Sequence, residues 1–268
     1  MATLTQVIFF SLIGGVVSLT GGVLLLANKK RARTLVKYAT PFAAGALLAA
    51  AFVDLLGEAA HVGDAEKALV GALLGIVGFF ILERFLHWFH HHHEDENNSK
   101  TDANTSLIII GDTVHNFIDG IAIAAAFLVS VPTGIVATLA VAAHEIPQEI
   151  GDFGLLLKKG MSRKNVIIAN ILSALATTVA AILFFTLGDQ ISLPLDMILG
   201  VVAGFFIYIA VSDIIPSIHK NEEKMIAGPQ TIMLLVGVIV VSLVTTQLHE
   251  YIDPSESSNH KTEIQQNN

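Results

Sequence analysis

Long apolar stretches separated by short polar segments dominate the chain. Each reaches about the 20 residues that a helix needs to cross the hydrocarbon core of a bilayer. The eight stretches cover residues 4–27, 40–60, 68–89, 105–130, 132–157, 165–188, 193–216 and 230–249. This pattern predicts an all-α polytopic membrane protein with eight transmembrane helices, in which residues 1–253 form a single transmembrane domain.

The positive charges between these stretches are distributed unevenly. All of the 15 Lys and Arg residues except Lys67 and Lys261 lie in or beside the segments that follow the first, third, fifth and seventh stretches. Because cytoplasmic loops are enriched in Lys and Arg, we expect both termini to lie outside the cytosol, in a cell-membrane protein. The polar tail, residues 254–268, is expected to be disordered.

Composition supports a membrane protein and narrows its chemistry. Hydrophobic residues make up 53% of the chain and charged residues 14%, whereas soluble domains have about 25% charged residues. Cysteine is absent, so thiolate metal sites and cysteine nucleophiles are excluded. The formal net charge of -8 argues against a nucleic-acid partner and in favour of cations.

Two of the apolar stretches carry several polar groups near the middle of the membrane. A charge at the bilayer centre costs at least about 2.5 kcal/mol, so it marks a candidate functional site by default. The groups are Asp112, His115, Asn116 and Asp119 in the first stretch, and His144, Glu145, Gln148, Glu149 and Asp152 in the second. Their spacing of three and four residues places each set on one face of a helix.

These two polar faces lie at a similar depth on helices that follow one another along the chain. A single polar residue there is more often a hydrogen-bonding contact between helices than a metal ligand. Several carboxylates, however, require a cation, because no apolar stretch supplies Lys or Arg near the same depth. Imidazole nitrogen and carboxylate oxygen together predict a divalent-cation site, for zinc, iron or manganese.

The motifs His115–Gly120 (HNFIDG) and His144–Phe153 (HEIPQEIGDF) resemble those of the ZIP (Zrt/Irt-like protein) divalent-metal transporters, especially the LIV-1-like branch. The resemblance implies a 3+2+3 helical arrangement with inverted repeats and a homodimer in the lipid bilayer. It implies Zn²⁺ as the transported substrate, with Fe²⁺, Mn²⁺ and Cd²⁺ as further candidates. No organic cofactor and no catalytic residue are expected.

The resemblance also implies which side chains bind metal. It assigns His115, Asp119, His144 and Gln148 to the main transport site. It assigns Asn116 and Glu145 to a neighbouring second site, bridged by Asp119, with Glu149 as an adjacent acid. Gln148 departs from the family pattern, which has His or Glu there, and its neutral amide is a weaker ligand.

Other polar residues suggest a route to and from this centre. Asp54, Glu58 and His61 lie toward the outer end of the second stretch, as cation-attracting groups or as an ordinary solvated helix end. On the cytosolic side, the candidates for an exit route are Asp112, Glu149, Asp152 and Asp213. Asp213 can equally be an ordinary residue at a helix end. The segment 90–104 contains His90, His91, His92 and His93, which predict a weak cytosolic chelator or sensor.

Three functions are compatible with these patterns. A transporter would move a divalent cation toward the cytosol. A membrane metal sensor would bind the ion without moving it. An intramembrane metalloprotease would use His144 and Glu145 as the start of an HExxH motif, but Gln148 occupies the position of its second His. We therefore expect a transporter and not an enzyme.

Overall fold

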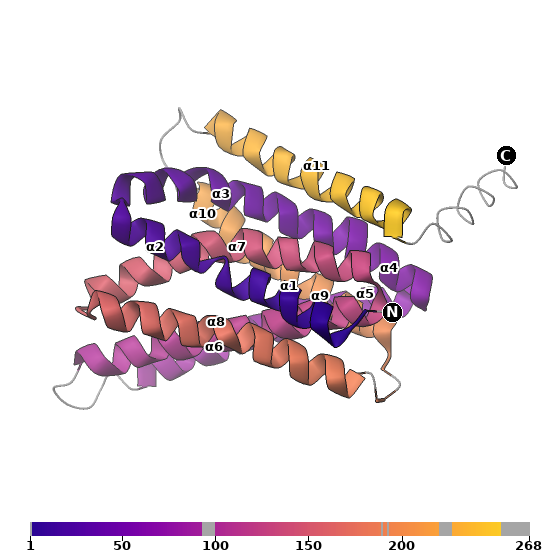
Figure 1. Ribbon diagram of the computed structural model, residues 1–268, viewed down its shortest axis with the longest axis horizontal. Coiled ribbons are helices and arrows are strands. Elements are labelled where there is room, and N and C mark those ends of the chain that lie inside the picture. The colour runs from indigo at the N-terminus through magenta and orange to yellow at the C-terminus, as the bar shows by residue number, and fades with distance from the viewer. Residues whose placement is uncertain (1, 93–99, 189, 192, 220–226, 253–268) are drawn as a thin grey trace, which may run out of the picture.

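The computed structural model describes residues 2–92, 100–188, 190–191, 193–219 and 227–252, and this part is built of helices, as predicted. The helices run side by side as a bundle (Figure 1). They are α1 (Leu4–Val16), α2 (Leu19–Ala27), α3 (Lys29–Ala49), η1 (Ala50–Leu55), α4 (Leu56–Val62), α5 (Ala65–His92), α6 (Lys100–Val129), α7 (Val131–Lys158), α8 (Arg163–Gly188), α9 (Leu195–Tyr208), η2 (Ile209–Ile214), α10 (Ile215–His219) and α11 (Ala227–Ile252). The predicted disordered tail and His93 lie outside the described residues, as do the side chains of His90, His91 and His92.

Seven helical segments of the described chain are long and apolar enough to cross a membrane, which supports an integral membrane protein. They are Leu4–Ala27, Lys29–Val62, Ala65–Phe85, Thr105–Val129, Arg163–Gly188, Leu195–His219 and Gly228–Ile252. The predicted fifth span, α7, is long enough with its 28 residues but does not meet the same hydropathy criterion. It contacts α1, α2, α3, α6, α8 and α11. A helix surrounded by protein in this way can carry a polar face that lipid would not tolerate.

Several predicted spans differ from simple α-helices. The first is divided into α1 and α2 at Val17 and Ser18, and the second and seventh each contain a six-residue π-helical segment, η1 or η2. The polar segment 28–37, expected to be a connection, forms the first turns of α3. Asn28 begins this helix, because its side chain accepts a hydrogen bond from the backbone N–H of Arg31 at 3.0 Å.

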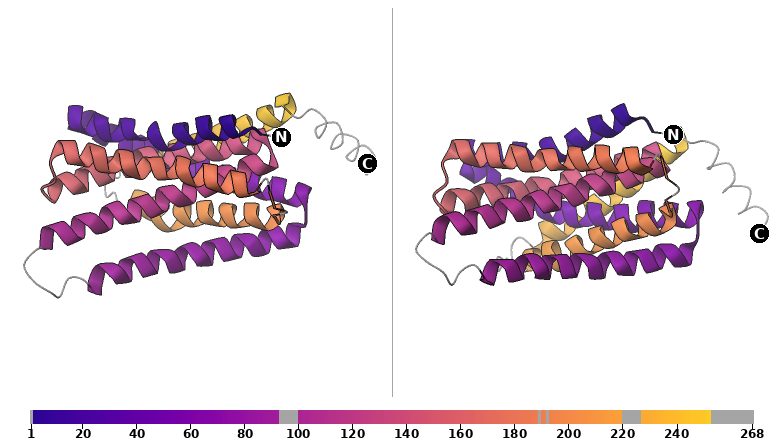
Figure 2. Two further views of the ribbon diagram at one scale, coloured as in Figure 1. Left: turned by 60° about the horizontal axis from the view of Figure 1, so that its bottom comes forward. Right: turned by 90° about the horizontal axis from the view of Figure 1, so that it is seen from below.

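Glycine brings two pairs of helices into close contact. A Cβ atom at Gly204 of α9 would lie 2.2 Å from the carbonyl oxygen of Ala72 in α5, and one at Gly45 of α3 would lie 2.0 Å from that of Leu234 in α11. Small residues therefore allow these backbones to touch. Figure 2 shows α9 beside α5 at one edge of the bundle.

The two glycine contacts follow the same local pattern. Gly45 precedes Asp54 of η1 by nine residues, and Gly204 precedes Asp213 of η2 by nine residues. The second predicted span (α3) thus packs on the eighth (α11). In the same way, the seventh (α9) packs on the third (α5). Two inverted repeats of three helices predict this correspondence.

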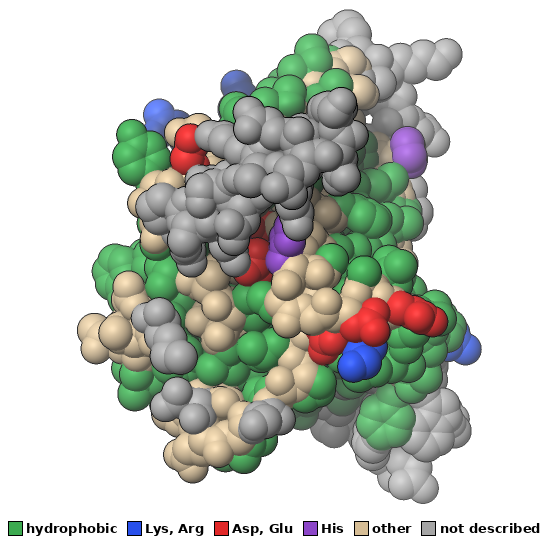
Figure 3. Space-filling model, turned by 90° about the vertical axis from the view of Figure 1, so that its right-hand side faces the viewer, with side chains coloured by type: hydrophobic (Ala, Val, Ile, Leu, Met, Phe, Trp, Pro, Cys, Tyr) green, Lys and Arg blue, Asp and Glu red, His purple; other side chains and the backbone are tan. Residues whose placement is uncertain are grey.

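The two ends of the described bundle are distinct. α1 begins and α11 ends at the same end, as an even number of crossings requires (Figure 1). Acidic and histidine side chains gather there among hydrophobic ones (Figure 3). The start of α3, the end of α7 and the start of α8 lie at the opposite end.

Candidate metal centre

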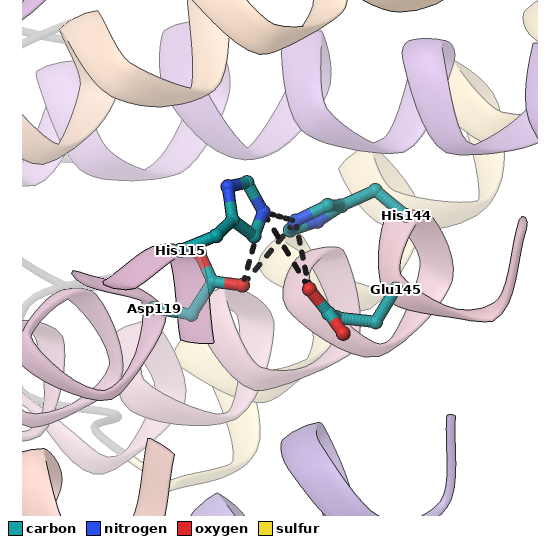
Figure 4. Close-up of side chains that lie close together, drawn as sticks. All are labelled: His115, Asp119, His144 and Glu145. Carbon is teal, nitrogen blue, oxygen red and sulfur yellow. Dashed lines mark hydrogen bonds and ion pairs between the residues drawn. The ribbon is translucent and has the colours of Figure 1, made fainter. Parts of the chain in front are cut away.

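Four side chains from α6 and α7 point toward one another inside the bundle (Figure 4). His115 and Asp119 lie one turn apart on α6, while His144 and Glu145 are neighbours on α7. One ligand atom from each residue can be chosen so that all lie within 4.8 Å of one another. Asp119, His144 and Glu145 are buried, and His115 is partly exposed.

The distances between these atoms resemble the edges of a coordination tetrahedron. Nε2 of His144 lies 3.2 Å from Nε2 of His115 and 3.3 Å from Oδ2 of Asp119. Oε1 of Glu145 lies 3.5 Å from Nε2 of His115 and 3.9 Å from Nε2 of His144. Ligands at the usual zinc distances would be about 3.4 Å apart around a tetrahedral ion. The four groups can therefore hold one divalent cation after small adjustments.

The surroundings of these side chains leave a nitrogen and several oxygens available to bind an ion. Nδ1 of His144 lies 3.1 Å from the backbone carbonyl of Ala140. Donation of the Nδ1 proton to that carbonyl leaves Nε2 free to bind a metal, as is common for histidine ligands. Oδ2 of Asp119 and both carboxylate oxygens of Glu145 are buried without a hydrogen-bond partner among the described residues. Buried acceptors of this kind are costly unless a cation or donor satisfies them.

Asn116, predicted for a second metal site, faces α8 through a set of hydrogen bonds. Its Nδ2 donates to Oδ1 of Asp112 at 3.2 Å and to Oγ of Ser173 at 3.3 Å. Its Oδ1 accepts from Oγ1 of Thr177 at 2.9 Å. The Asn116 amide therefore joins α6 to α8 in this conformation.

Glu149 is also separate from the four clustered residues. It is fully buried, and neither of its carboxylate oxygens has a hydrogen-bond partner in the described part of the chain. Gln148, in the main site that the resemblance implies, instead lines a cavity next to His115.

This cavity has a volume of about 430 Å³ and runs from the candidate centre toward the end of the bundle opposite the termini. Its polar lining residues are Glu83, Asp112, His115, Gln148, Asp152 and Asp213. Three of the predicted exit residues therefore share one space. Glu83 was missed because it lies near the end of its span, although a carboxylate in an apolar stretch is itself a signal. The Tyr208 hydroxyl donates to Glu83 at 2.5 Å.

The residues predicted for the outer mouth are largely enclosed. Asp54 is 1% exposed and Glu58 is 6% exposed, whereas His61 is exposed. Oδ1 of Asp54 lies 3.1 Å from Nε2 of His249 on α11. Sequence reasoning missed His249, which ends the last apolar stretch and lies 195 positions from its partner.

Comparison with known proteins agrees with this geometry. A sequence model of the family described as "ZIP Zinc transporter" matches residues 3–107 and 92–245. Zinc transporter ZIP10 of Danio rerio is 41% identical over 119 residues, which are 44% of this chain and 14% of that protein. Zinc transporter foi of Drosophila melanogaster is 39% identical over 119 residues, 44% of this chain and 17% of that protein. Zinc transporter ZIP4 of Homo sapiens is 43% identical over 118 residues, 44% of this chain and 18% of that protein.

The matched segment thus spans less than a fifth of each of these relatives. The family model, by contrast, covers most of the present chain, including both polar motifs and the four clustered side chains. The resemblance predicted from those motifs is confirmed. The chain belongs to the ZIP zinc transporter family.

Proposed function

We propose that this protein transports Zn²⁺, or a similar divalent cation such as Fe²⁺, Mn²⁺ or Cd²⁺, across a membrane. The observation that carries the proposal is the four-residue cluster of His115, Asp119, His144 and Glu145, whose spacing suits one tetrahedral ion. The relatives are named zinc transporters. Their names support zinc as the first candidate substrate.

The proposed direction is toward the cytosol, with both termini outside. Burial of Asp54 and Glu58 near the end that bears the termini, and the cavity toward the other end, support a conformation open to the cytosol. Transport would require a second conformation in which the outer mouth opens. In that state Asp54, Glu58 and His61 would attract the arriving cation. Asp112, Asp152 and Asp213, together with Glu83, would line its exit.

The proposal assigns the fourth ligand position to Glu145, because its Oε1 lies near both imidazoles. Gln148 remains a candidate ligand from the cavity side. Asn116 and Glu149 remain candidates for a second ion, although coordination by Asn116 would compete with its hydrogen bond from Thr177. A homodimer in the cell membrane also belongs to this proposal.

Uptake by proteoliposomes tests the function directly. The purified chain should give saturable uptake of radiolabelled zinc, and unlabelled iron, manganese and cadmium salts added in turn should compete according to preference. Metal binding without flux would support the sensor instead. Cleavage of a transmembrane peptide would support the protease, which family membership and Gln148 both disfavour.

The exit cavity gives a second prediction. Asp152→Asn and Asp213→Asn should each lower the maximal rate of zinc uptake several-fold, because each removes a negative charge from the release route. Initial rates at increasing zinc concentration measure the effect. Glu66→Gln provides the control, since Glu66 is exposed at the other end of the bundle. Rates equal to those of this control would exclude the two aspartates from the route.

A further inference from the structure

The first turns of α3 form a concentrated basic surface at the end of the bundle opposite the termini. One third of the chain's 15 Lys and Arg residues fall within nine positions: Lys29, Lys30, Arg31, Arg33 and Lys37. No Asp or Glu precedes Asp54. Helices α1, α2 and α3 therefore provide no carboxylate that could neutralise this surface.

Four of these five basic residues line one hollow. This open space of about 400 Å³ is lined by Lys29, Lys30, Arg33, Thr34 and Lys37. The spacing i, i+1, i+4, i+5 and i+8 places them on one side of the helix. Ala32, which is fully buried, marks the side that packs on the protein. The hollow thus faces away from the bundle.

Three of the cations around the hollow have no acidic partner in the part of the chain that the structure describes. Lys29, Lys30 and Arg33 are exposed, and none forms an ion pair with a carboxylate of the described residues. The first turn of α3 adds the positive end of its helix dipole. The hollow therefore concentrates positive charge and hydrogen-bond donors, which suit a phosphate group.

An aromatic side chain next to the hollow places it at the edge of the membrane. Tyr38 follows the lining residue Lys37 on the same helix and is 36% exposed. The ammonium group of Lys37 lies 5.9 Å from the centre of the Tyr38 ring. Tyrosine is enriched at the level of lipid headgroups, and α3 continues from there as a membrane span. A ligand in the hollow would have lipid chains beside it.

We propose that this hollow binds the phosphate of an anionic phospholipid headgroup. The general bias of cytoplasmic segments toward Lys and Arg predicts their side of the membrane, but it does not require four of five lining residues to be basic. The exposed ring of Tyr38 beside Lys37 favours a lipid over free phosphate, because a bound lipid can cover this ring. Basic clusters next to a membrane span bind anionic lipids by the same electrostatic attraction.

Native mass spectrometry of the full chain in detergent tests this site. The protein is titrated with short-chain phosphatidylglycerol and, separately, with phosphatidylcholine of the same chain length. The wild type should retain phosphatidylglycerol preferentially. The triple variant Lys29→Gln, Lys30→Gln, Arg33→Gln should lose about tenfold or more of this preference, because surface cations each contribute measurably to anionic-lipid binding.

A second triple variant controls for total charge. Lys158, Arg163 and Lys164 are exposed at the same end of the bundle, in another basic segment. Their replacement by Gln removes the same charge and should leave the preference intact. An equal loss in both variants would overturn the proposal, as would a wild type without preference. Displacement of the lipid by inorganic phosphate, but not by chloride at the same ionic strength, would assign the hollow to free phosphate and also overturn it.

Discussion

Asp119→Ala and His144→Ala are each expected to abolish metal uptake while the protein still inserts into the membrane. Each change removes one candidate ligand from the cluster. Each also removes the contact of 3.3 Å between Oδ2 of Asp119 and Nε2 of His144. Loss of a residue that merely supports a metal ligand already costs about 10–100-fold in affinity or activity. Loss of a ligand should therefore lower initial zinc uptake into proteoliposomes by at least about 100-fold.

Matched controls separate the site from general effects on the chain. His219→Ala removes an exposed histidine, and Glu66→Ala removes an exposed carboxylate, both outside the four-residue cluster. Each should retain most of the uptake activity. Size-exclusion chromatography in detergent should show the same profile for all four variants. Uptake at the wild-type rate by both Asp119→Ala and His144→Ala would refute the proposed site.

The positions of these four residues were accessible from the sequence for a simple reason. A helical period places residues three or four positions apart on one face, so His115 and Asp119 had to share a face of α6. A charged side chain is energetically costly in lipid, which indicated that this face of α6 meets the polar face of α7. The structure brings two residues from each helix together. Their binding of metal stays a prediction.

Other features depend on contacts that no local pattern contains. Tyr208 and Glu83 meet across 125 positions, and Asp54 and His249 across 195. The sequence located Asp54 in an apolar stretch but offered no way to choose its partner. The π-helical segments η1 and η2 were also not predicted, because hydrophobic periodicity does not distinguish a wider turn from an α-helix.

The expected α7 span shows how burial changes the meaning of hydropathy. This helix does not meet the composition criterion for a membrane span that its neighbours meet. Its buried residues include His144, Glu145 and Glu149, and six other α-helices surround it. Sequence reasoning could recognise it because the polar groups fall on a face within an otherwise apolar helix. Because protein surrounds α7, its polar face does not contact lipid, although the same polar residues lower the mean hydropathy of the helix.

Gly75→Leu is expected to destabilise the fold more than any exposed substitution on α5. A Cβ atom at Gly75 would lie 2.2 Å from the carbonyl oxygen of Val201 and 3.0 Å from Cα of Gly204, both in the backbone of α9. A backbone atom cannot move aside as a flexible side chain does, so the two helices must separate. We expect a loss of at least about 3 kcal/mol in stability, at the upper end of ordinary overpacking.

Gly78→Leu on the same helix is the matched control, because a Cβ atom there would have no heavy atom within 4 Å in the described part of the chain, apart from its own turns of helix. It should be neutral or slightly stabilising, since leucine favours helix more than glycine does. Thermal unfolding in detergent, followed by loss of the monodisperse size-exclusion peak, compares the two variants. Equal stability would contradict the close packing of α5 on α9. A selective loss at Gly75 would confirm the close packing of α5 on α9, the two helices that carry Glu83, at the wall of the cavity, and its hydrogen-bond donor Tyr208.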